Sequence, residues 1–164
     1  MPFRHLASVA TAATFLALSA AAASAGSLVD VQLWDSGAST PMMAGLEYTG
    51  AGPVDISKAT MGIKVSQANA PAGVVSFKVT NTSKDNVHEM VLFSLADPSQ
   101  PLPYKADENK VDEGKAGYKG EVEELDPGKS GTFTTALRPG KYLLACNVAG
   151  HFAGGMWTAF EVTK

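Results

Sequence analysis

The chain has few residues of the types that most often bind metals or form disulfides. Its 164 residues include one cysteine, Cys146, and three histidines. A single cysteine cannot form an intramolecular disulfide, and it excludes a structural zinc site of the usual multi-cysteine kind. A basic excess is also missing, because 13 lysines and arginines stand against 16 aspartates and glutamates. Without that excess the chain cannot neutralise a phosphate backbone, so we expect no nucleic-acid partner.

Charge is absent over residues 6–29, directly after a short basic start. The stretch contains Ala23-Ser24-Ala25, the small-x-small pattern at which a signal peptidase cleaves. The alternative is a retained membrane anchor, but ten of residues 6–25 are alanine, which makes the segment weakly apolar for a permanent span. We therefore predict a cleaved signal peptide at 1–25, which leaves residues 26–164 as a periplasmic chain with no stable membrane span.

A long helical period is missing from residues 26–164, where apolar and polar residues instead tend to alternate. Alternation with a period of two marks half-buried strands, and a run that is apolar on both faces marks a central strand. These patterns predict strands at 29–33, 61–65, 75–79, 87–95, 133–137, 141–146 and 156–162. Short strands separated by Pro, Gly, Asn and Asp turns indicate an all-β domain, either a β-sandwich or a barrel.

Two regions do not follow the alternation. Residues 35–60 are rich in glycine and proline, which predicts a long loop or insertion. Residues 97–130 are polar and charged, and both a short helix and an ordered loop are compatible with them. Within this region, residues 105–126 hold eight acidic residues and four lysines. This acidic segment either steers a basic partner or is a solvated loop.

The residues suited to chemistry concentrate in one short stretch and one distant histidine. Cys146, His151 and Met156 follow one another at intervals of five residues, between two predicted strands. The glycines of this stretch allow a tightly curled loop, which points a thiolate, an imidazole and a thioether at one centre. His88 shares a strand face with Met90, and we expect that face to point inward, so that its imidazole reaches the same centre.

This set of side chains favours copper. Soft sulfur combined with imidazole selects copper, and two histidines, one cysteine and a weak axial methionine form the blue-copper arrangement. Zinc prefers several cysteines or an oxygen ligand. Coordination also explains an unpaired cysteine in an oxidising compartment, because a metal-bound thiolate is shielded and held deprotonated. We predict one copper ion bound by His88, Cys146, His151 and Met156.

Two other interpretations account for the same residues. The first is ordinary core packing, since a cysteine that ends an apolar strand, a histidine beside Met90 and a methionine before Trp157 are each common in cores. The second is a cysteine hydrolase, with Cys146 as the nucleophile and His151 as the base. That enzyme requires a helix N-terminus beneath the cysteine and a third, orienting residue. The sequence predicts a strand before Cys146 and offers no evident partner.

The spacing Cys146-x4-His151-x4-Met156, with His88 upstream, resembles the cupredoxins, the type 1 blue copper proteins. The resemblance extends over residues 61–164, and the loop spacing is similar to that of rusticyanin and sulfocyanin. It implies a Greek-key β-sandwich that holds one type 1 copper ion, which alternates between Cu(I) and Cu(II). It also implies that the two histidines and the cysteine are equatorial ligands and that the methionine is axial.

Two positions depart from the pattern of the family that the sequence resembles. Glu89 stands where many cupredoxins have an asparagine that ties the ligand loops together, and Ala149 stands where relatives often have proline. Hydrogen bonds around the ligands tune a bound metal, so both departures bear on loop rigidity and reduction potential.

The resemblance implies an exported one-electron carrier, and we expect no enzymatic activity, because four protein ligands leave no open position for a substrate. The alternative is a copper-handling protein on the same fold, either a chaperone or a resistance factor, at which the Met42-Met43 pair hints. We expect redox proteins, such as a cytochrome or an oxidase, to dock on a monomer near His151. No charge lies between Cys146 and Ala159, which allows close approach.

Overall fold

The computed structural model describes residues 26–164, so the predicted signal peptide at 1–25 lies outside the described residues. The elements in chain order are β1 (Ser27–Asp35), η1 (Ile56–Lys58, a 3-10 turn), β2 (Met61–Val65), β3 (Asn69–Pro71), β4 (Gly73–Asn81), β5 (His88–Leu95), β6 (Tyr104–Lys105), β7 (Lys110–Val111), β8 (Tyr118–Leu125), β9 (Ser130–Leu137), β10 (Gly140–Ala145) and β11 (Trp157–Thr163). Within residues 26–164, no helix is long and apolar enough to cross a membrane.

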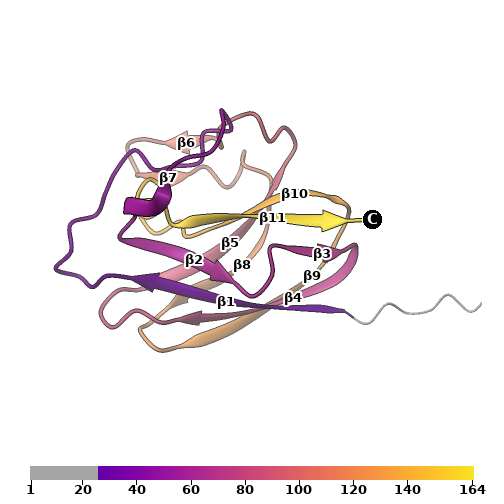
Figure 1. Ribbon diagram of the computed structural model, residues 1–164, viewed down its shortest axis with the longest axis horizontal. Coiled ribbons are helices and arrows are strands. Elements are labelled where there is room, and N and C mark those ends of the chain that lie inside the picture. Colours follow the sequence, from indigo (N-terminus) through magenta and orange to yellow (C-terminus); the bar gives the residue numbers. More distant parts are fainter. Residues whose placement is uncertain (1–25) are drawn as a thin grey trace, which may run out of the picture.

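Two sheets face each other and form a sandwich (Figure 1). One sheet has the strand order β2-β1-β4-β9, and the other has the order β3-β11-β10-β5-β8. Alternate side chains of the first sheet point into the space between the sheets, so that Val29, Val31 and Leu33 of β1 are buried while Asp30 and Gln32 are exposed. The period of two therefore arises from burial on one face, and the predicted all-β sandwich is confirmed.

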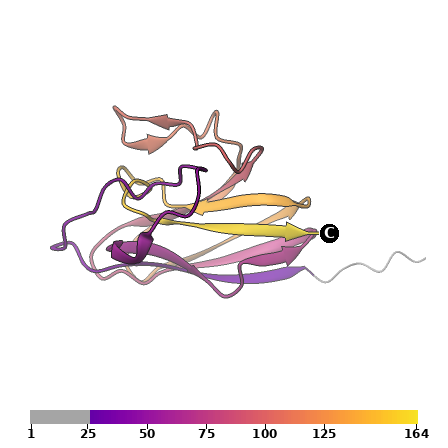
Figure 2. The ribbon, with the colours of Figure 1, turned by 45° about the horizontal axis from the view of Figure 1, so that its top comes forward.

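Strand β5 is buried on both faces, as its sequence predicts. Met90 and Leu92 belong to the core between the sheets, whereas Val91 and Phe93 belong to a second apolar cluster on the opposite face of the sheet. Val111 of β7 lies in that second cluster, which places the segment between β5 and β8 over the outer face. Figure 2 shows the β6–β7 hairpin beyond the layers of the sandwich.

The region 97–130, for which the sequence left a short helix and an ordered loop open, contains the strand β8. It pairs with β5 in antiparallel fashion and forms the edge of its sheet. Val122 is its one buried residue, so the apolar alternation is too weak to identify the strand from sequence. At Gly120, with φ of 130°, a Cβ atom would lie 2.3 Å from the ring of Phe133, so this contact with β9 requires glycine.

The 146–156 loop, which joins β10 to β11, lies at the end of the sandwich opposite the carboxyl terminus, next to the segment 36–60 (Figures 1 and 2). One hydrogen bond joins this segment to the loop itself, and a second joins it to the first residue of β11. The backbone N–H of Leu46 donates to the carbonyl of Ala153 at 2.9 Å, and the indole N–H of Trp157 donates to the carbonyl of Leu46 at 2.7 Å. The insertion is thus part of the wall around this loop.

Candidate metal centre

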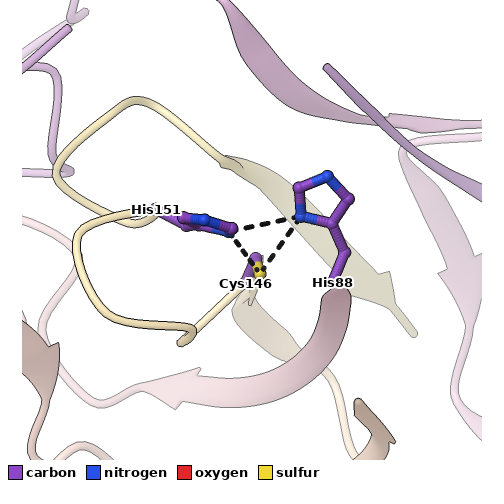
Figure 3. A group of neighbouring side chains, drawn as sticks. All are labelled: His88, Cys146 and His151. Carbon is purple, nitrogen blue, oxygen red and sulfur yellow. Dashed lines mark hydrogen bonds between the residues drawn. The ribbon is translucent and has the colours of Figure 1, made fainter. Parts of the chain in front are cut away.

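Three side chains from separate parts of the chain converge at this end of the sandwich (Figure 3). His88 is the first residue of β5, Cys146 directly follows β10, and His151 lies in the middle of the 146–156 loop. Because β5 and β10 are antiparallel neighbours, the start of one strand lies beside the end of the other. The two strands thus position His88 and Cys146, and the loop returns His151 to them.

The donor atoms form a small triangle. The Nδ1 atoms of His88 and His151 are 3.2 Å apart, and the Sγ atom of Cys146 lies 3.4 Å from Nδ1 of His151 and 3.9 Å from Nδ1 of His88. A triangle with these sides has a centre about 2 Å from every corner, close to the ~2.0 Å bonds of imidazole and the ~2.3 Å bonds of thiolate to a transition metal. The cluster therefore has the size of a three-coordinate metal site.

The fold of the loop explains how His151 reaches this position. Gly150 has φ of 84°, which favours glycine, and a Cβ atom there would lie 2.6 Å from the Cε of Met42. The carbonyl of His151 accepts from the N–H of Met156 at 3.0 Å, and the carbonyl of Met156 accepts from the N–H of Cys146 at 3.0 Å. These bonds close the loop and hold Cys146 opposite Met156.

The fourth predicted ligand, Met156, is fully buried next to this cluster and belongs to the core between the sheets. The structure thus brings together the ligand atoms of the two histidines and the cysteine, and it places the backbone of Met156 against that of the cysteine. The axial role of the Met156 thioether stays a prediction.

Burial sets the protonation of the three side chains. It raises the pKa of the Cys146 thiol to about 12, although the N–H of Glu89 lowers it in part. Burial, and after it the proximity of His88, lowers the pKa of His151 to about 4, and burial lowers the pKa of His88. At neutral pH the site therefore holds a thiol and two neutral imidazoles. Such a buried, protonated thiol is a poor nucleophile, which argues against the cysteine hydrolase.

One residue of the site, Asp35 at the end of β1, was missed by the sequence analysis. Its Oδ2 accepts a hydrogen bond of 2.7 Å from Nε2 of His88, and the two side chains are 3% and 0% exposed. Burial raises the pKa of Asp35, but hydrogen bonds to its charged form outweigh this effect and lower the pKa to about 2. Their donors are Ser83, Asn86, His88 and the backbone N–H of Gly37. No spacing motif connects Asp35 to a histidine 53 residues away.

Glu89 and Asn147, which directly follow His88 and Cys146 in the sequence, have different roles. The backbone N–H of Glu89 donates to Sγ of Cys146 at 3.5 Å, and burial, followed by the charge of Glu121, raises the pKa of the Glu89 carboxyl to about 7. The amide of Asn147 bridges the backbone of Val111, accepting from its N–H at 2.7 Å and donating to its carbonyl at 3.1 Å. In this chain, Asn147 therefore ties the loop to β7.

No protein-family model and no curated protein matches the chain. Its fold, however, is similar to solved structures. Rusticyanin from Thiobacillus ferrooxidans superposes with a TM-score of 0.51 at 19% sequence identity, over 85% of this chain and 79% of that chain. Another structure, described as the copper protein rusticyanin, has a TM-score of 0.51 at 19% identity over 85% and 80%. A reduced auracyanin from the photosynthetic bacterium Roseiflexus castenholzii has a TM-score of 0.49 at 18% identity over 85% and 98%.

The chain has the cupredoxin β-sandwich, so the resemblance noted in the sequence is confirmed for the fold. Its His88, Cys146 and His151 cluster has the donor types and the size to hold one type 1 copper ion.

Proposed function

We propose that this chain binds one copper ion through His88, Cys146 and His151, with Met156 as the fourth ligand, and carries single electrons between redox proteins. The observation that supports this proposal most directly is the triangle of two imidazole nitrogens and one thiol sulfur. Copper favours one thiolate combined with two imidazoles. Asp35, a carboxylate hydrogen-bonded to this set, contacts the far nitrogen of His88, so it does not supply the oxygen ligand that zinc would favour.

Burial supports electron transfer over catalysis at this centre. His88 and Cys146 are fully buried, and His151 is partly exposed. A site enclosed by protein ligands has no open coordination position for a substrate. The two imidazole nitrogens and the sulfur already lie close enough together to share one ion, so a change of its oxidation state would require little rearrangement of the protein. This is the behaviour expected of an electron carrier.

The partner is proposed to dock over the partly exposed edge of His151. Its neighbours Ala149 and Ala153 are uncharged and accessible, and Met42 of the insertion lies beside Gly150. We expect Ala153→Lys to slow electron transfer even at high salt, where long-range steering is screened. The control is Ala159→Lys, on an exposed position of β11. Equal rates for the two variants would contradict docking at His151.

The acidic residues of β8 and of the segment before it are a second feature that bears on association with a partner. Glu121 and Glu124, together with Glu113, lie close enough to Glu89 to raise the pKa of its buried carboxyl. We propose that this charge steers a basic partner toward the docking face, which would make association faster at low ionic strength.

Export to the periplasm is part of the proposal and rests on the predicted signal peptide.

The copper-handling alternative is favoured by one observation. Met42 and Met43 are 48% and 39% exposed, and Met42 lines a cavity of about 360 Å³ together with His151. Exposed thioethers beside a metal site would suit the transfer of Cu(I), because thioether sulfur is a soft ligand.

Voltammetry in the presence of a Cu(I) chelator distinguishes the two functions. An electron carrier gives a reversible one-electron wave and keeps its copper through repeated reduction. A copper-handling protein loses copper to the chelator on reduction, and Met42→Leu with Met43→Leu slows that loss. If the wild type loses copper to the chelator and the two substitutions slow that loss, the result would contradict a function as electron carrier.

A further inference from the structure

Asp35 is the one carboxylate in hydrogen-bond contact with the three residues of the cluster, within the part of the chain that the structure describes. We infer that Asp35 is a positioning residue, which fixes the His88 tautomer and favours Cu(II) over Cu(I) at the proposed copper site. The second half of this inference rests on the proposed function, whereas the first half concerns the metal-free protein.

The geometry assigns the tautomer of His88. A carboxylate oxygen can only accept, so the 2.7 Å contact with Asp35 Oδ2 requires a proton on Nε2 of His88. A neutral imidazole carries one such proton, which leaves the Nδ1 lone pair directed at His151 and Cys146. In the metal-free protein, His151 therefore donates its own Nδ1 proton to His88. Asp35 thus prepares His88 as a ligand before any metal arrives.

The two carboxylate oxygens of Asp35 accept hydrogen bonds from different donors. The Oδ1 atom accepts from the N–H of Gly37 at 2.7 Å, which stabilises the turn that follows β1. The Oδ2 atom accepts from Asn86 Nδ2 at 3.0 Å as well as from His88. A residue that served only the turn would not need to present its second oxygen to the histidine.

The charge of Asp35 has a consequence for the oxidation states of the site. A fixed negative charge attracts a divalent ion more strongly than a monovalent ion at the same place. Burial of the Asp35 side chain limits the screening of this attraction by solvent. If bound copper accepted one electron from a reduced redox protein, the change from Cu(II) to Cu(I) would weaken that attraction. Asp35 therefore lowers the reduction potential.

The variant Asp35→Asn tests the charge while keeping the size of the side chain. The N–H of Gly37 donates to Oδ1, and Asn86 and His88 donate to Oδ2, so an amide must direct its NH₂ at one of these donors in either orientation. The matched control is Asp85→Asn, because Asp85 is exposed and lines a pocket with Asp35. Loss of a hydrogen-bond partner behind a metal-binding histidine costs about 10- to 100-fold in affinity. We expect Asp35→Asn to lose this much affinity for Cu(II), and to lose about tenfold less affinity for Cu(I).

Competition with chelators specific for each ion measures the two affinities. A tenfold difference between the two losses raises the reduction potential by about 59 mV. Equal losses of Cu(II) and Cu(I) affinity in Asp35→Asn, or an equal change of potential in Asp85→Asn, would overturn the role in redox tuning.

A second measurement needs neither a variant nor copper. Nitrogen-15 NMR of the metal-free wild type should show His88 as the Nε2–H tautomer, with its ring proton protected from exchange. The Nδ1–H tautomer would overturn the positioning role, even if a variant of Asp35 proved too unstable to study. A wild type with the expected tautomer but no copper binding would contradict the proposed function and leave the tautomer assignment intact.

Discussion

Copper binding should release one proton from Cys146. Because burial raises the pKa of this thiol to about 12, the side chain is protonated throughout the range in which the protein is handled. A copper-bound thiolate has lost that proton, so the apparent association constant should rise about tenfold for each unit of pH. At pH 7 deprotonation lies five units away, which costs about 7 kcal/mol of the binding free energy.

The other titratable groups of the site determine how this proton is measured. The pKa of His151 is lowered to about 4 and that of His88 is lowered as well, so neither histidine releases a proton above neutral pH. Glu89, with a pKa raised to about 7, would respond to the new positive charge, and Glu89→Gln removes that contribution. We therefore expect one proton per copper in Glu89→Gln at pH 8.

Titration calorimetry in two buffers of different ionisation enthalpy counts the protons directly. A release close to zero would mean that the thiol is ionised before the metal binds. A release of two would mean that a histidine is protonated in the metal-free protein. Either result would refute the protonation states derived from the burial of this site.

Three further predictions concern the proposed axial ligand, the effect of copper on stability and the edge strand β8. Met156→Leu should retain copper and raise the reduction potential by more than about 59 mV, because loss of the thioether disfavours Cu(II), and voltammetry measures this shift. The metal-free protein should stay folded by circular dichroism, and free copper at a thousand times its dissociation constant should add about 4 kcal/mol to the free energy of unfolding. Gly120→Ala should cost about 2 kcal/mol because of positive φ and the Phe133 ring, with Gly114→Ala as the calorimetric control.

Among the elements that the sequence predicts well are the strands with one buried and one exposed face. β1 shows this, because burial at every second position produces the alternation that identifies the strand. β8 was missed because it lies at a sheet edge and buries only Val122. The sequence showed that β5 is apolar on both faces. It did not show that the β6–β7 region covers the outer of these faces, because that contact depends on tertiary packing.

The residues of the site also differ in how well the sequence predicts them. Cys146, His151 and Met156 are close in sequence, so a regular spacing predicts a shared loop, and His88 was placed by the face of its strand. Asp35 belongs to another strand of the other sheet, and only the packing of the two sheets brings it to His88. Contacts of this kind leave no periodic trace in a sequence.

The absorption spectrum during titration with Cu(II) tests the central claim most directly. Metal-free wild-type protein should develop an intense blue charge-transfer band that saturates at one copper per chain, because a copper–thiolate bond forms at Cys146. Cys146→Ser, in which a hard hydroxyl replaces the thiol, should stay colourless and lose most of its affinity. A blue Cys146→Ser variant, or a wild type that binds Cu(II) without colour, would contradict the assignment of this site.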